Sequence, residues 1–128
     1  MSSKFVFEDK PSQNILVVED EPADQILIEK NVKEFWRQAN VVSASSIKQA
    51  YNACKAQQFD LVVLDLNLPD GYGPSSINEI RRFNRNVPII VVTGMLPDLT
   101  IEVSLKNGAT HVVSKRQLME RGFQGFLN

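Results

Sequence analysis

Short runs of branched apolar residues alternate along the chain with longer segments in which apolar side chains recur at helical spacing. The short runs predict five strands, at residues 15–18, 41–43, 61–64, 89–92 and 112–113. The first, third and fourth runs are continuously apolar, which is typical of parallel strands covered on both faces. The alternation of strand and helix therefore predicts an α/β fold, in which a parallel sheet is wrapped by helices on both sides.

Helices are expected after each strand, and several of their ends carry residues suited to a helix terminus. Proline fits the first turn of a helix, so the first helix is expected to begin at Pro22. Ser46 and Gln49 have the spacing of a capping box, and Gly108 is suited to end the fourth helix. The expected helices begin at Pro22, begin at Ser46, follow Pro74, span Pro97 to Asn107 and span Gln117 to Leu127.

The composition indicates one globular domain, because 43% of the 128 residues are hydrophobic and 23% are charged. We place this domain at residues 14–128 and interpret residues 1–13 as a short N-terminal extension. A formal net charge of −1 gives no electrostatic reason to expect binding to nucleic acid or membrane. No apolar run has the length of a spanning helix, and the single cysteine, Cys54, fits a reducing cytoplasm.

Polar residues with reactive side chains follow four of the predicted strands. Glu19 and Asp20 come after the first strand, Asp65 after the third, Thr93 after the fourth and Lys115 after the fifth. The carboxyl ends of parallel strands meet at one edge of the sheet, so these side chains are expected to converge there. Each residue alone also fits an ordinary role as a helix cap, a turn residue or a surface lysine. Their joint placement favours a functional site.

Three carboxylates within a few ångströms repel one another, so they raise their pKa values or recruit a cation. A set of oxygen ligands with no neighbouring histidine or cysteine suits a hard cation, and Mg²⁺ fits two or three carboxylates plus waters. The sequence then favours Asp65 as a nucleophile that forms an aspartyl-phosphate. Lys115 and Thr93 would contact the phosphoryl oxygens.

Four motifs resemble those of the receiver domains of response regulators in two-component signalling. They are ILVVEDEP, DLVVLDLNLPDGYG, VPIIVVTG and GATHVVSK, and the resemblance covers about residues 14–127. It implies a flavodoxin-like (βα)5 fold whose five-stranded parallel sheet has the strand order 2-1-3-4-5. It also implies that Asp65 is the phosphoacceptor and that Asp20 binds Mg²⁺ directly. Glu19 is then a second acid of the metal site, and the backbone carbonyl of Asn67 completes the protein ligands.

The resemblance also implies how the phosphoryl group is sensed and who the partners are. Thr93 is the switch hydroxyl that moves toward the phosphoryl group, and Lys115 binds a phosphoryl oxygen. A histidine kinase or a histidine phosphotransfer protein is the expected donor, in a bacterial cytoplasm. The surface of the fourth helix, fifth strand and fifth helix is expected to bind an unidentified downstream protein and to support homodimerisation. Met95 is expected to shield the acyl phosphate from water.

Three residues depart from the pattern of the family. Glu19 stands where aspartate is commoner, and its extra methylene alters how a metal is held. Val112 stands where the family usually has a switch aromatic, which puts the coupling of that ring to Thr93 in doubt. Arg116 stands where the family usually has proline after a cis bond. A cis bond before a non-proline residue costs roughly 2.5–4 kcal/mol, so a trans bond is expected here.

Three functional interpretations stay open on the sequence. The first is a stand-alone response regulator that is not an enzyme and acts through protein contact or onward phosphoryl transfer, because no domain is expected after the fifth helix. The second is a degenerate receiver that serves as a phosphorylation-independent scaffold, which Val112 and Arg116 keep open. The third is a phosphatase of the haloacid-dehalogenase type. It is disfavoured, because Asn67 stands where that class has an acid.

Overall fold

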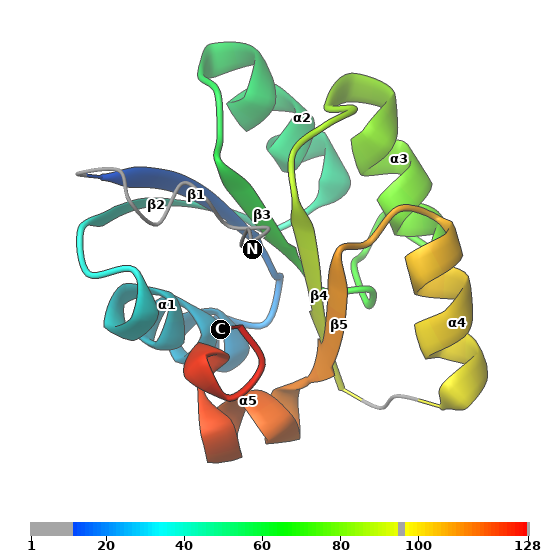
Figure 1. Cartoon of the computed structure of the whole chain (residues 1–128). Helices are drawn as coiled ribbons and strands as arrows, with labels where there is room; N and C mark the ends of the chain where they lie inside the picture. The colour runs from blue at the N-terminus through cyan, green and yellow to red at the C-terminus, as the bar shows by residue number, and fades with distance from the viewer. Residues whose placement is uncertain (1–11, 95–96, 128) are drawn as a thin grey trace.

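The computed structural model describes residues 12–94 and 97–127, in which strands and helices alternate (Figure 1). The strands are β1 (Gln13–Val18), β2 (Ala39–Ala44), β3 (Leu61–Leu64), β4 (Ile89–Thr93) and β5 (His111–Ser114). The helices are α1 (Pro22–Phe35), α2 (Ile47–Ala56), α3 (Ser75–Phe83), α4 (Asp98–Lys106) and α5 (Lys115–Arg121). Residues 1–11 of the expected extension and Met95 lie outside the described residues, so what was expected of them stays a prediction.

The five strands form one parallel sheet in the order β2-β1-β3-β4-β5, which confirms the predicted fold class and strand order. The three continuously apolar runs are the three central strands of this sheet. β3 and β4 are buried at every residue, and β1 is buried at all but Asn14. β2 and β5 lie at the two edges and are only partly buried. Burial on both faces therefore explains why the central strands carry no polar alternation.

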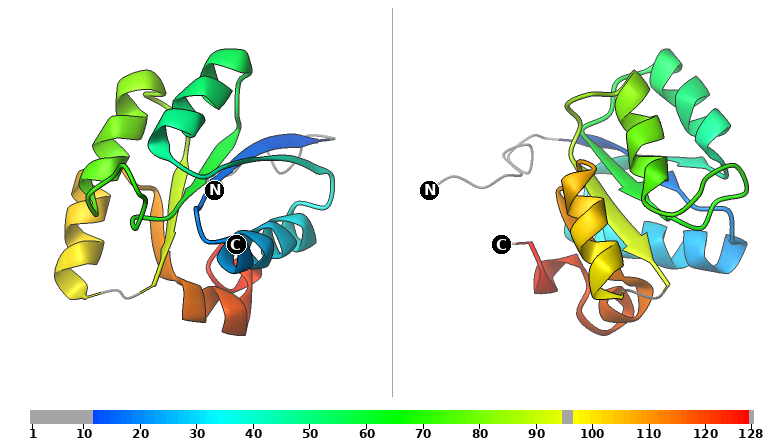
Figure 2. Two further views of the ribbon diagram at one scale, coloured as in Figure 1. Left: turned by 180° about the vertical axis from the view of Figure 1, so that it is seen from behind. Right: turned by 90° about the vertical axis from the view of Figure 1, so that its right-hand side faces the viewer.

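The helices cover both faces of the sheet, and one apolar cluster lies on each face (Figures 1 and 2). On one face α2 and α3 pack against the strands, and α4 lies beside α3; on the other face lie α1 and α5. Ile77 and Ile80 of α3 are fully buried in the first cluster. Ile28 and Val32 of α1 are buried in the second. None of the helices among the described residues is long and apolar enough to cross a membrane.

The cap of α2 is only half of the predicted capping box. The Ser46 hydroxyl accepts a hydrogen bond from the backbone N–H of Gln49 (3.1 Å), as expected. The Gln49 side chain, however, accepts from the backbone N–H of Ser45 (2.7 Å), one residue before the cap. A complete capping box is instead present at the start of α5, between Ser114 and Gln117. The Gln49 side chain thus satisfies the N–H of Ser45 in place of that of the cap residue Ser46.

The predicted boundaries of the last helix are wrong. The Ser114 cap starts α5 at Lys115, two residues before the expected Gln117. The helix ends at Arg121, because Gly122 adopts a φ of +65°, a conformation that residues with a Cβ rarely adopt. A short 3-10 turn, Phe123–Gly125, follows in place of the predicted helical continuation. The early start matters for function, because it fixes the backbone of Lys115 within a capped first turn.

Candidate functional site

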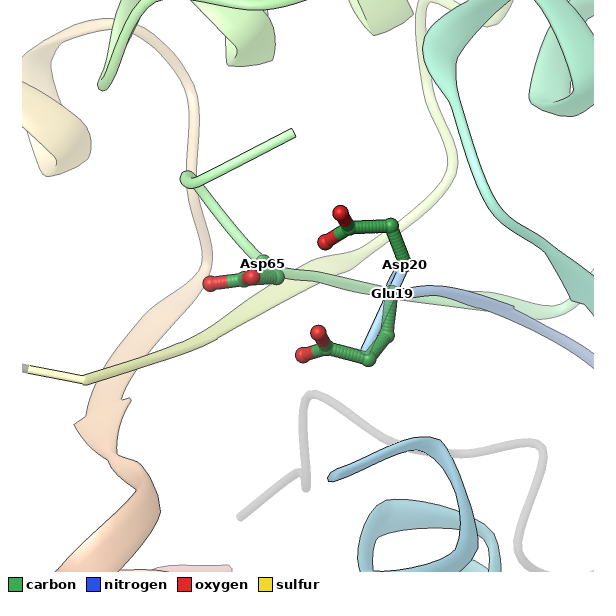
Figure 3. Close-up of side chains that lie close together, drawn as sticks. All are labelled: Glu19, Asp20 and Asp65. Atoms are coloured by element: carbon green, nitrogen blue, oxygen red, sulfur yellow. The ribbon is translucent and has the colours of Figure 1, made fainter. Parts of the chain in front are cut away.

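Three carboxylates meet at the carboxyl ends of β1 and β3, as the sequence predicted. Glu19, Asp20 and Asp65 each have a carboxylate oxygen within 4.8 Å of those of the other two (Figure 3). Glu19 and Asp65 are buried, with exposed fractions of 0% and 1%, whereas Asp20 is exposed. Strand pairing causes this convergence, because Val18 lies opposite Leu64 and the chains leave adjacent strands at the next residue. The N–H of Asp65 donates to the carbonyl of Val18 (3.0 Å) and extends the ladder into the site.

Lys115 brings a positive charge to the same site. Its Nζ lies 3.0 Å from Glu19 Oε1, 3.6 Å from Asp65 Oδ2 and 2.7 Å from Asp24 Oδ2. The Lys115–Arg116 peptide is trans, as expected from the absence of proline. The lysine still reaches the acids, because α5 begins at Lys115 and aims its first turn toward the ends of β1 and β3.

Burial dominates the electrostatics of Glu19. It raises the pKa of this carboxyl to about 7, and the negative charge of Asp65 adds to the rise. The backbone N–H of Glu21, which donates to Glu19 Oε2 (3.0 Å), and the ammonium of Lys115 act in the opposite direction. These contacts favour the ionised form without offsetting the loss of water around a fully buried carboxylate.

The charge of Lys115 is stabilised by its surroundings. Burial lowers the pKa of this lysine, whereas its contacts with Asp24 and Glu19 raise it by more. The charge of Asp65 adds to the rise, so the pKa of Lys115 lies above the ordinary lysine value. The lysine is therefore a fixed cation at the edge of the acidic cluster across the physiological pH range.

The acidic cluster has the donor set of a hard-cation site. Asp65 Oδ1 is buried and accepts no hydrogen bond from any residue within 12–94 and 97–127. A buried carboxylate oxygen without a donor is costly unless a cation or an ordered water contacts it. Together with the oxygens of Asp20 and Glu19, this atom provides the oxygen ligands that Mg²⁺ prefers. The residues present therefore fit a divalent cation.

Thr93 and Asn67 occupy the positions expected for them, although their roles stay predictions. Thr93 is the last residue of β4, is buried and pairs in register with Ser114 of β5. Asn67 is exposed two residues after Asp65, between the buried side chains of Leu66 and Leu68. The structure thus places both residues at the same end of the sheet as the acids.

The sequence analysis missed one charged residue of the site, Asp24. It lies in the first turn of α1, 91 residues from Lys115 in the sequence, and its carboxylate accepts a hydrogen bond from the lysine. The one sequence feature that placed Asp24 near the site was its spacing of four residues from Asp20, near the start of the first helix. Nothing in that spacing, however, indicated that the lysine would come from the opposite end of the chain.

Comparison with known proteins agrees with this geometry. A family model for the response regulator receiver domain matches residues 15–124. The chain belongs to this family. Among curated proteins, the transcriptional regulatory protein KdpE of Staphylococcus aureus is 35% identical to this receiver domain over 101 residues. The match covers 79% of this chain and 42% of KdpE, so the chain spans less than half the length of that relative.

Solved structures of receiver domains share the fold. The receiver domain of the sensor histidine kinase PA1611 from Pseudomonas aeruginosa, with magnesium coordinated in its active-site cleft, is 29% identical. Its TM-score is 0.68 over 85% of this chain and 93% of that one. The phosphorylated cyanobacterial phytochrome response regulator RcpA is 25% identical, with a TM-score of 0.73 over 88% of this chain and 87% of that one.

Proposed function

We propose that this receiver domain accepts a phosphoryl group on Asp65 from a histidine kinase or a histidine phosphotransfer protein. The observation that carries the proposal is a buried Asp65 carboxylate flanked by two acids and by the ammonium of Lys115. One oxygen of Asp65 would attack the phosphorus atom, and the bond from phosphorus to the donor would break. The donor atom keeps that electron pair, and the product is an acyl phosphate.

Mg²⁺ would be held by Asp20 and Asp65, with Glu19 as a further acid and the backbone carbonyl of Asn67 as a fourth group. The open carboxylate oxygens of the cluster support this assignment, as does the magnesium in the PA1611 receiver domain. The ion supplies positive charge that neutralises the phosphoryl oxygens during transfer. Lys115, whose Nζ lies 3.6 Å from Asp65 Oδ2, would bind a phosphoryl oxygen, and the burial of Asp65 limits the access of water to the acyl phosphate.

The output of the domain is a change in protein binding, not a turnover reaction. Phosphorylation favours one state of an existing equilibrium, in which Thr93 moves toward the phosphoryl group. Val112 borders a groove with Ile101 of α4 and Gln117 of α5, on the surface that would meet a downstream protein or a second copy. A valine at this position fills less space than an aromatic ring, which leaves the groove open to a partner.

Incubation with acetyl phosphate and Mg²⁺ is expected to add one phosphoryl group to the protein, because the donor meets a preformed nucleophile and cation. Intact-mass spectrometry before and after incubation measures the addition, and Asp65→Asn is the matched control that must stay unlabelled. An unlabelled wild-type protein would support the scaffold interpretation. Steady release of phosphate from several different monoesters would instead support a phosphatase.

Asp20→Asn is expected to raise the melting temperature of the metal-free protein by a few degrees. The substitution removes the charge of one of three carboxylates that lie within 4.8 Å of one another, so the folded state loses like-charge repulsion. Millimolar Mg²⁺ is expected to raise the melting temperature of the wild type and to have a smaller effect on the variant. Thermal melts of both proteins with EDTA or Mg²⁺ measure this. A wild-type melt that Mg²⁺ leaves unchanged would contradict the metal site.

A further inference from the structure

The shortest contact of the Lys115 ammonium is with Asp24, not with the phosphoacceptor. Lys115 Nζ donates a hydrogen bond to Asp24 Oδ2 at 2.7 Å, whereas Asp65 Oδ2 lies 3.6 Å away. A separation of 3.6 Å is too long for a hydrogen bond. The lysine that would bind the phosphoryl group is therefore already engaged by another carboxylate, on a different helix.

Helix capping does not explain the direction of the Asp24 side chain. An aspartate in the first turn of a helix is favourable wherever its carboxylate lies, because the helix dipole attracts negative charge. Here the N-cap residue is Glu21, and no side chain caps α1. The Asp24 carboxylate extends across the space between α1 and α5 to meet Lys115. Asp24 is 33% exposed and the lysine 18% exposed, so the pair lies at the mouth of the site.

We propose that Asp24 is a positioning residue that competes with the phosphoryl group for Lys115 and thereby slows phosphorylation of Asp65. The inference rests on the proposed function and adds to it a residue that restrains the rate. In the unmodified protein the ammonium is shared between Asp24 and Glu19. As the phosphoryl group is transferred, its oxygens must draw the same ammonium away from Asp24 or share its charge.

The energetic consequence follows from the difference between ground state and transition state. An interaction that is strong before the reaction and weakened in the transition state raises the barrier. The contact between Asp24 and Lys115 is of this kind, because negative charge on the phosphoryl oxygens grows where Lys115 is needed. Glu19 also contacts the ammonium, at 3.0 Å, but it belongs to the acidic cluster itself. Asp24 is therefore the competing group that can be removed without changing that cluster.

Replacing Asp24 by asparagine is expected to increase the rate of labelling by acetyl phosphate. The increase is expected to be roughly fivefold, the factor that corresponds to a partly exposed ion pair. The initial rate is followed by intact mass at fixed Mg²⁺ over a series of acetyl phosphate concentrations. The gain is expected in the rate at saturating donor, not in the donor concentration at half-maximal rate. Damage to the fold would slow labelling, whereas loss of the ion pair is expected to speed it. The direction of the change therefore separates these two causes.

Three further variants isolate the role of the ion pair. Asp24→Glu keeps the charge and is expected to label close to the wild-type rate. Glu34→Gln removes one charge from the exposed side of the same helix and is also expected to leave the rate unchanged. In a Lys115→Ala background, proteins with and without Asp24→Asn are expected to label at equal, slow rates.

The outcomes are distinct from those that test the proposed function. If the wild type is not labelled at all, the proposed function is wrong and the inference falls with it. If the wild type is labelled but Asp24→Asn is equally fast or slower, only the inference is overturned. A rate increase that persists in the Lys115→Ala background, or that Glu34→Gln reproduces, would also overturn it, because the effect would then be a general change in charge.

Discussion

Arg81→Met is expected to lower the free energy of unfolding by about 3 kcal/mol, because hydrogen bonds from a charged donor to buried carbonyls contribute about 1.5–3 kcal/mol each. The half-buried guanidinium of Arg81 donates to three backbone carbonyls, those of Asn84 (3.2 Å), Val87 (2.6 Å) and Gly108 (2.8 Å). Methionine retains the apolar stem but offers no donor, so these carbonyls lose their partner in the folded state.

The Arg81 contacts connect segments that position the functional site. Arg81 lies in α3, Val87 precedes β4, and Gly108 lies in the turn between α4 and β5. The φ of Gly108 is +114°, and a Cβ at this position would lie 3.1 Å from Arg81 Nε. Glycine therefore permits both the turn and the close approach of the guanidinium. β4 leads to Thr93 and β5 leads to Lys115, so the loss of these bonds affects the strands that carry both residues.

Chemical denaturation of the wild type, Arg81→Met and Arg82→Met measures the effect. Arg82 is the matched control, because it is the next residue of α3 and is exposed. Its substitution is expected to change the free energy of unfolding by less than about 0.5 kcal/mol, as is usual for surface positions. Equal destabilisation by both variants would contradict the role assigned to the three carbonyl contacts.

The fold was predictable because its central strands are marked by local sequence. Only a strand covered on both faces reads as a continuous apolar run, and the three such runs are β1, β3 and β4. The convergence of Glu19 and Asp65 followed from the same pattern, because adjacent parallel strands end at the same edge. The placement of these acids therefore required no knowledge of side-chain contacts.

The features that sequence analysis missed depend on contacts between distant segments. The hydrogen bonds of the Arg81 guanidinium to backbone carbonyls, and the ion pair of Asp24 with Lys115, join residues on different helices and loops. The start of α5 was also misplaced, although Ser114 and Gln117 have the capping-box spacing. The predicted strand ended at Val113 and the predicted helix began at Gln117, so Ser114 was assigned to neither element. A residue can end a strand and cap a helix at once, and only the structure showed that Ser114 does both.

The metal-free protein is expected to lose stability as the pH rises from about 4.5 to about 7, through the titration of Glu19. Burial raises the pKa of Glu19 in the folded state from 4.5 to about 7, so between these values the folded state binds more protons than the unfolded state. The free energy of unfolding therefore falls with rising pH in this window and changes no further above it. The contribution is at most about 3 kcal/mol, from 1.36 kcal/mol for each pH unit. The raised pKa of Lys115 acts only near and above the ordinary lysine value, outside this window.

Comparison with Glu19→Gln isolates this contribution from the other carboxylates of the chain. Glutamine has nearly the same shape but does not titrate, so the difference between wild type and variant is expected to fall with pH only in this window. Denaturant unfolding in EDTA at several pH values from about 4 to about 9 gives the difference curve, because this range extends beyond both pKa values of Glu19. Mg²⁺ favours the ionised cluster, so its addition is expected to shrink the fall. A difference that is flat, or that rises with pH, would show that the Lys115 ammonium at 3.0 Å outweighs the burial of Glu19.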